Sequence, residues 1–148
     1  MPVCIDVSKA RIVIIGGGKV TLRKLHTIVQ YAHSIHIYAK DILPEIKLLP
    51  VTCTEGFYDS ASLADAILVY ACTNDPDLNR RICEDGRKIG ALVSSASESD
   101  DCDFLSPAIF QHKDMSVAIS SNGQQIRKSI EWRNAIRAFI LDDLIHRR

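Results

Sequence analysis

Short apolar runs alternate with longer amphipathic stretches along the first two thirds of the chain. The short runs are rich in β-branched residues and are bounded by Gly, Pro, Asp or Ser, which is typical of strands, whereas the longer stretches carry apolar residues at helical spacing. One run, residues 66–72, is apolar throughout, as in a strand covered on both faces. The pattern predicts strands at 11–15, 34–38, 51–54, 66–72 and 91–95, and helical segments at 19–32, 41–49, 60–65 and 76–88.

The order of these segments indicates the fold class. Asp75 and Pro76 mark the start of one helix and Gly90 stops it, which separates the last two strands by a clear helical connection. Repeated alternation of buried strands and helices favours an α/β protein with a Rossmann-like, doubly wound parallel sheet and helices on both faces.

The last third of the chain has a different pattern. Residues 107–111 and the alternating run 115–120 predict a β-hairpin, and a turn at 122–123 leads into a helix over 124–148. A hairpin and one amphipathic helix cannot bury their own apolar surface. We therefore expect two regions, a Rossmann domain over 1–113 and a dimerisation region over 114–148 that forms a homodimer.

Composition and charge narrow the class of protein. The 18 basic residues balance 18 acidic ones, so the chain has no net positive charge that would favour binding to nucleic acid. The tail is more basic than the body, because residues 111–148 hold seven Lys and Arg against four acidic residues. No apolar run approaches the roughly 20 residues of a membrane helix, and the N-terminus lacks a signal-peptide pattern. We expect a cytoplasmic protein without a membrane partner.

Cysteine and histidine spacing predicts no metal site. The five cysteines are an odd number without a C-x-x-C pair, and the five histidines show no ligand spacing. Cys102 alone, with no second thiol or histidine near it in the sequence, is a weak candidate for a metal ligand.

A glycine-rich turn is the first candidate for chemistry. Gly16, Gly18 and Thr21 take the three positions of G-x-G-x-x-G/A, directly after a predicted strand and at the start of a helix. Glycine lets backbone N–H groups approach a pyrophosphate, whose charge the helix N-terminus favours. The alternative is a tight turn without a ligand. The residues predicted to bind a dinucleotide here are Gly16, Gly17, Gly18, Lys19 and Val20.

Asp41 follows the second predicted strand, where an acidic residue accepts the ribose 2′-hydroxyl of NAD. Lys40 stands next to Asp41, and a cation there could bind the 2′-phosphate of NADP, so NADP remains an alternative cofactor. For either residue, the alternative is a solvated surface position.

Four segments, in this order, resemble a known family: VIIGGGKVTLRKL at 13–25, ACTNDPDLN at 71–79, DDCDFLSPAIF at 100–110 and VAISSNG at 117–123. The family is that of precorrin-2 dehydrogenase/sirohydrochlorin ferrochelatase, the NAD-binding module of siroheme synthase. The resemblance spans essentially the whole chain, including residues 2–7. It implies a Rossmann domain followed by a dimerisation region, NAD as cofactor, and oxidation of precorrin-2 to sirohydrochlorin, in some members with iron insertion.

The resemblance also implies site residues. Thr73, Asn74 and Asn79 fall in its A-T…L-N segment, at the carboxyl end of the fourth predicted strand, where an open α/β sheet places its ligand crevice. We expect these residues to contact the cofactor. Capping of the turn is the alternative.

The catalytic position departs from the family. The aspartate of the family's N-V-V-D segment falls on Ser97, and its asparagine falls on Ser94. A hydroxyl cannot act as the same base near neutral pH. Glu98, Asp100 and Asp101 stand close enough in the sequence to substitute, so the predicted catalytic set is these three residues and Ser97. A solvated acidic loop is the alternative.

A tetrapyrrole substrate carries many carboxylates, and the basic tail offers partners for them. The predicted substrate-binding residues are His112, Ser120, Asn122, Arg127, Lys128 and Arg133. Two other functions stay open: a module that binds NAD or a tetrapyrrole without turnover, and a metal chelatase alone.

Overall fold

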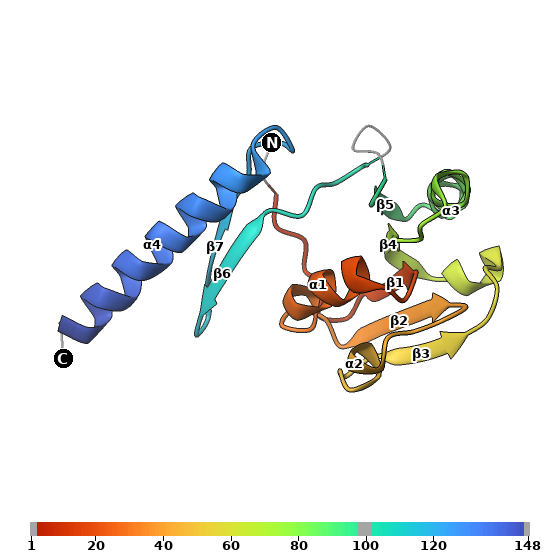
Figure 1. The fold of residues 1–148 in the computed structure, drawn as a ribbon, viewed down its shortest axis with the longest axis horizontal. Coiled ribbons are helices and arrows are strands. Elements are labelled where there is room, and N and C mark those ends of the chain that lie inside the picture. Colours follow the sequence, from red (N-terminus) through yellow and green to blue (C-terminus); the bar gives the residue numbers. More distant parts are fainter. Residues whose placement is uncertain (1–2, 98–101, 147–148) are drawn as a thin grey trace. The chain divides into compact units, whose positions relative to one another are not determined.

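The computed structural model describes residues 3–97 and 102–146, the last four of these by their backbone only. The chain divides into two compact units, Met1–Phe104 and Leu105–Arg148 (Figure 1).

The first unit is a five-stranded parallel sheet with strand order β3-β2-β1-β4-β5. Right-handed crossovers through helices are the usual connection between such strands. Its elements are β1 (Arg11–Ile15), α1 (Lys19–Ile28), β2 (Ser34–Ala39), α2 (Pro44–Lys47), β3 (Thr52–Glu55), the 3₁₀ helix η1 (Ser60–Leu63), β4 (Ala66–Ala71), α3 (Pro76–Lys88) and β5 (Leu92–Ser95). The Rossmann-like fold predicted from the sequence is confirmed.

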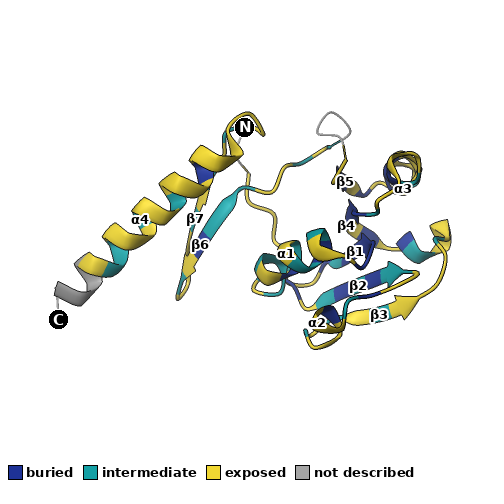
Figure 2. Cartoon of the chain, in the orientation of Figure 1, coloured by how far each residue is buried: buried dark blue, intermediate teal, exposed yellow. Residues whose placement is uncertain are grey.

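Two apolar cores lie on opposite faces of this sheet, because successive residues of a strand point to opposite sides. Ile12 and Ile14 of β1 belong to the core that contains Leu25 of α1, whereas Val13 belongs to the core that contains Ile82 of α3. All five side chains are fully or almost fully buried. Figure 2 shows the burial concentrated in the central strands.

Helix α3 begins and ends where the sequence predicts. The carboxylate of Asp75 accepts hydrogen bonds from the backbone N–H groups of Asp77 (3.0 Å) and Leu78 (3.1 Å), so it caps the helix, and Pro76 follows at the first helical position. Gly90 then takes a positive φ of 82°, which a residue with a side chain rarely adopts.

Helices α1 and α2 are both shorter than predicted. Helix α1 ends at Ile28 instead of residue 32, because the chain tightens there: the N–H of Gln30 bonds to Thr27 and that of Tyr31 bonds to Ile28, three residues back. Helix α2 is a single turn, and Pro44 takes its first position.

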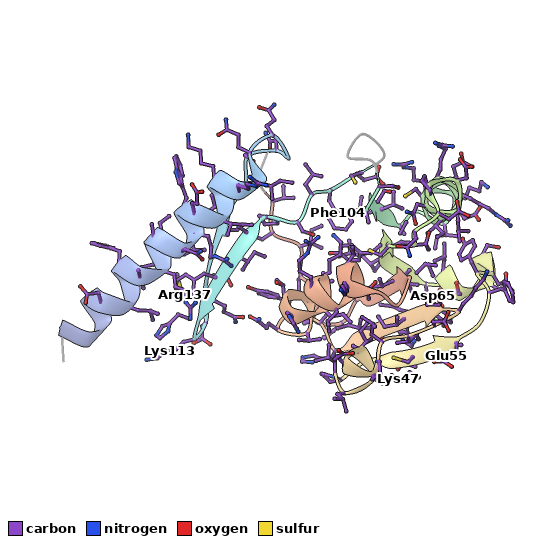
Figure 3. The ribbon with its side chains drawn as sticks, viewed as in Figure 1. Lys47, Glu55, Asp65, Phe104, Lys113 and Arg137 are labelled. Carbon is purple, nitrogen blue, oxygen red and sulfur yellow. The ribbon has the colours of Figure 1, made fainter. Side chains whose placement is uncertain are left out.

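Strand β5 is an edge strand, and the chain covers its outer edge with the residues that follow the 98–101 segment. Asp103 exchanges two hydrogen bonds with Val93: its N–H donates to the Val93 carbonyl (2.8 Å) and its carboxylate accepts from the Val93 N–H (3.0 Å). The N–H of Ser95 donates to Cys102 Sγ (3.1 Å). Phe104, labelled in Figure 3, packs edge-on against Tyr70, with 5.2 Å between the centres of the two rings. It is the last residue of the first unit.

The second unit is an antiparallel hairpin with one helix: β6 (Ala108–His112), β7 (Met115–Ile119) and α4 (Ile126–His146). Arg133 holds the helix to the hairpin, since its Nη1 donates to the Ile109 carbonyl (2.9 Å). No helix in the described part of the chain combines the length and the apolar character that crossing a bilayer requires.

The boundary between the units lies before the position expected from the sequence. Residue 113 forms part of the hairpin turn, and β6 pairs along its whole length with β7, from Ala108 opposite Ile119 to His112 opposite Met115. Strand β6 therefore belongs to the second unit, which begins at Leu105 and not at residue 114.

Replacing Asp103 with alanine tests the role of the edge contact. The Val93 N–H lies in a fully buried residue and loses its partner in Asp103→Ala, so we expect the free energy of unfolding to fall by about 1–3 kcal/mol. Denaturant unfolding measures it. The matched control is Asp77→Ala, which removes an exposed ion pair with Arg80 and is expected to cost at most about 1 kcal/mol. Equal losses in the two variants would contradict the edge role.

Candidate functional site

The glycine loop between β1 and α1 is held by two very close backbone contacts. A Cβ on Gly16 would lie 2.3 Å from the carbonyl oxygen of Cys72, and Gly16 also has a positive φ of 120°. A Cβ on Gly17 would lie 2.3 Å from the carbonyl oxygen of Asp41. The loop therefore passes between the segments that follow β4 and β2, and neither glycine can be replaced without moving backbone. Burial raises the pKa of the Cys72 thiol, which keeps this residue neutral beside the loop.

Gly18 differs from its two neighbours, because a Cβ there would meet no atom within 4 Å. It is the N-cap of α1, its backbone is extended, and no side chain caps the helix. The first turn also contains no acidic residue. Space is thus open beside Gly18, at the positive end of a helix whose first backbone N–H groups, including those of Lys19 and Val20, have no capping side chain, as an anion-binding site requires.

Thr21 stands where the motif has Gly or Ala, and the structure explains why it is accepted. Its side chain is fully buried, and its hydroxyl donates to the Gly16 carbonyl at 2.7 Å. The hydroxyl therefore ties the first turn of α1 back to the loop.

Asp41 lies beside the loop, as its spacing predicts. Its carbonyl is the atom that excludes a side chain at Gly17, and the N–H of Leu43 donates to the Gly17 carbonyl at 3.0 Å. Asp41 itself is exposed. Lys40 points away toward β3, where its Nζ lies 4.5 Å from the centre of the Phe57 ring.

Asn79 organises the carboxyl end of β4. It is fully buried, and its Oδ1 accepts from the N–H (3.0 Å) and hydroxyl (2.8 Å) of Thr73. Its Nδ2 donates to the Thr73 carbonyl (3.1 Å) and to Ser97 Oγ (3.1 Å). All four hydrogen bonds join Asn79 to Thr73 or Ser97, which is the arrangement expected if Asn79 caps the turn after β4. Asn74 is exposed on the same loop.

Ser97 is joined to this network after β5. Its Oγ lies 3.0 Å from Ser95 Oγ, and its N–H donates to the same hydroxyl at 3.2 Å. The structure thus brings Ser97 next to Asn79, at the carboxyl end of the sheet. The other three residues of the predicted catalytic set, Glu98, Asp100 and Asp101, lie outside the described residues.

The predicted substrate-binding residues of the second unit separate into two places. Ser120 and Lys128 line an open depression of about 250 Å³, and Arg127 and Lys128 line a larger one of about 500 Å³ around the start of α4. Asn122, with a positive φ of 51°, lies in the turn that leads to them.

His112 and Arg133 do not join that group. His112 pairs with Met115 at the far end of the hairpin, beside the turn residue Lys113 that Figure 3 labels. The guanidinium of Arg133 is bonded to Ile109 and, through Nε, to Asn134 Oδ1 at 2.8 Å, so it serves the packing of α4 on β6. Sequence separation alone could not show that His112 and Arg133 lie apart from the other predicted substrate-binding residues.

Sequence reasoning missed the contact between Lys40 and Phe57. An aromatic residue after a strand is expected in the core. The one sequence feature that could have indicated an exposed Phe57 is the glycine before it, Gly56, at the end of a predicted strand. Within the described residues, no three His, Cys, Asp or Glu side chains gather as metal ligands.

Comparison with known proteins places the chain in a family. The NAD(P)-binding family NAD_binding_7 matches residues 3–108. The "Probable multifunctional siroheme biosynthesis protein HemA" of Ruminiclostridium josui is 28% identical over 142 residues, 86% of this chain and 28% of that protein. The siroheme synthase of Nitrosomonas europaea is 29% identical over 128 residues, 83% of this chain and 27% of that enzyme. The chain thus spans little more than a quarter of the length of these two relatives.

A solved structure shares the fold. SirC, a precorrin-2 dehydrogenase, superposes with a TM-score of 0.81 at 19% sequence identity, over 93% of this chain and 69% of that one. The family match covers the whole parallel sheet, including the open glycine loop. The chain therefore belongs to this NAD(P)-binding family, in agreement with the resemblance of its motifs to the NAD-binding module of siroheme synthase.

Proposed function

We propose that the chain binds NAD at Gly16, Gly17 and Gly18 and catalyses the oxidation of precorrin-2 to sirohydrochlorin in siroheme biosynthesis. The observation that carries this proposal is the open space at Gly18, at the start of a helix without a capping side chain and beside the segment of Asp41. The substrate is suggested by the names of the relatives, which are proteins of siroheme synthesis.

The residues present fit a nicotinamide dinucleotide. The N–H groups of Gly18, Lys19 and Val20 lie uncapped at the positive end of α1, where they suit a pyrophosphate. Thr73 and Asn74 lie on the loop after β4, on the other side of Gly16. NAD, when bound, supplies the hydride acceptor, and the chain supplies binding and orientation.

We infer NAD in preference to NADP from the position of Asp41. A carboxylate at this place accepts the ribose 2′-hydroxyl and repels a 2′-phosphate. Lys40, the adjacent cation, lies over the Phe57 ring.

Oxidation of precorrin-2 also releases a proton, and Ser97 is a poor acceptor for it. A serine hydroxyl does not act as a base near neutral pH, and this one is bonded to Asn79. We propose that the proton passes to solvent or to Glu98, Asp100 or Asp101. Hydride transfer depends mainly on positioning, so we expect turnover that is slow but measurable.

The hydroxyl at position 97 also favours a second candidate, a module that binds NAD or a tetrapyrrole without turnover. A chelatase without dehydrogenase activity would need only a carboxylate that collects pyrrole protons while a metal ion enters. Incubating the protein with precorrin-2 and NAD, then with sirohydrochlorin and ferrous or cobaltous ion, distinguishes the three functions.

We propose that the second unit binds the carboxylates of the substrate and forms a homodimer. Arg127 and Lys128 at the start of α4 supply the positive charge, near Ser120. Helix α4 has apolar residues that the hairpin leaves uncovered: Ile136 and Ile140 are half-buried, whereas Trp132 (57% exposed) and Phe139 (75% exposed) are exposed. Figure 2 shows this exposure along α4. A second copy of the chain would cover the exposed face.

Replacing Gly18 with valine tests the cofactor site. A Cβ at position 18 meets no atom within 4 Å and adds bulk where we propose that the pyrophosphate binds, so we expect the dissociation constant for NAD to rise at least about tenfold while the protein stays folded. Calorimetric titration and thermal unfolding measure the two effects. Gly16→Ala is the contrasting variant, because its Cβ meets the Cys72 carbonyl and should lower the melting temperature. NAD affinity that is unchanged in Gly18→Val would refute the site.

Replacing Ser97 with aspartate tests the proton acceptor. If the missing carboxylate limits turnover, Ser97→Asp should raise the rate of NAD reduction with precorrin-2 by about tenfold, which corresponds to about 1.4 kcal/mol of barrier. Ser97→Asn is the control of the same shape that cannot accept the proton. Should neither the natural chain nor Ser97→Asp reduce NAD, the dehydrogenase proposal fails and the binding module takes its place.

The dimer is tested by charge on the exposed face of α4. We expect light scattering to give a dimer at micromolar concentration and a monomer for the double variant Trp132→Glu, Phe139→Glu, because burying two carboxylates in the interface is costly. Leu48→Glu, at a position in the first unit that is 85% exposed, should leave the mass unchanged. A monomeric natural chain would contradict the proposal.

A further inference from the structure

Phe57 is an aromatic ring left open at the carboxyl end of the sheet. It is the second residue after β3, and its side chain is 83% exposed. The preceding residue, Gly56, donates its N–H to the Ala39 carbonyl at 2.9 Å. This bond fixes the chain at Phe57 against the end of β2.

Lys40 connects this ring to the glycine loop. Its Nζ lies 4.5 Å from the ring centre, a distance at which an ammonium group and an aromatic face attract each other. The next residue, Asp41, has its carbonyl packed on Gly17. Two contacts thus connect the glycine loop to the aromatic ring: Gly17 packs on Asp41, the proposed ribose acceptor, and Lys40, the residue before Asp41, lies over Phe57.

The strand order decides which half of a dinucleotide meets this face. Strands β2 and β3 lie on one side of β1, and β4 and β5 lie on the other. In a doubly wound sheet the two halves of a dinucleotide extend to opposite sides of the pyrophosphate. The ribose beside Asp41 is the adenosine ribose, so the base attached to it extends toward β3. Ser97 follows β5 on the opposite side, where Asn79 of α3 bonds to it and to Thr73 after β4.

We propose that the Phe57 ring, with Lys40 held against it, is a stacking platform for the adenine base of the dinucleotide. This inference rests on the proposed binding of NAD and adds a subsite to it. Stacking of a base on an aromatic ring needs no hydrogen-bond readout, and an open ring at a strand end provides the required face.

The experiment compares Phe57→Ala, Phe57→Tyr and Ile89→Ala in calorimetric titrations with NAD and with ADP-ribose, which has no nicotinamide. Loss of one stacked base weakens binding by about tenfold, so we expect that rise in both dissociation constants for Phe57→Ala and values within about twofold of the natural chain for Phe57→Tyr. Ile89 is also an exposed apolar residue, 48% exposed, but it precedes β5 at the opposite end of the sheet, and Ile89→Ala should change neither constant.

A spectroscopic readout separates stacking from a general loss of affinity. In transferred NOE spectra of ADP-ribose, the adenine protons should show cross-peaks to a phenylalanine ring in the natural chain and to a tyrosine ring in Phe57→Tyr. NAD affinity unchanged in Phe57→Ala, or lost equally in Ile89→Ala, overturns the platform while Gly18→Val still tests the proposed cofactor site. Failure of the natural chain to bind either nucleotide overturns both proposals.

Discussion

A close approach of backbone to backbone, at Gly16 and Gly17, fixes the geometry on which the rest of the site depends. The space that a methyl group would need at these positions is already taken by the carbonyls of Cys72 and Asp41. Because those carbonyls belong to the segments that follow β4 and β2, the loop cannot shift without moving two neighbouring connections. The start of α1, the amides proposed to bind the pyrophosphate and the position of Asp41 are therefore set together, and the hydroxyl of Thr21 ties the helix to the same point.

The two sides of the loop are built differently. On the β4 side, the buried amide of Asn79 satisfies its hydrogen bonds with Thr73 and Ser97, so that a neutral network holds the chain where the proposed reaction would occur. On the β2 side, the side chains of Asp41 and Phe57 are exposed, and the Nζ of Lys40 lies over the Phe57 ring. A carboxylate at position 97 would accept from Asn79 where the hydroxyl does now, so the departure from the family changes the charge of the site more than its shape.

The sequence predicted the sheet, the glycine loop and the place of Asp41 because each depends on a local pattern: an apolar run, a required glycine or a fixed spacing after a strand. It did not predict contacts between elements. An acid in a polar loop is expected to be solvated, yet Asp103 pairs with β5. Arg133 was predicted to bind the substrate, yet its guanidinium bonds to β6, and His112 lies at the opposite end of the hairpin from the group near Lys128. These outcomes depend on which segments meet in three dimensions, which hydrophobic periodicity does not report.

The contact that Asp103 makes also determines where the nucleotide-binding unit can end. Its last strand finishes at Ser95, but the outer N–H and C=O groups of that strand are paired by residues 102 and 103. A polypeptide released after β5, by proteolysis or by a premature stop, would present an open row of hydrogen-bonding groups to other sheets. Such a fragment would retain every residue of the glycine loop and still tend to associate edge to edge. A partner joined to the C-terminal side of this unit would leave the edge of β5 covered where the junction lies beyond Phe104.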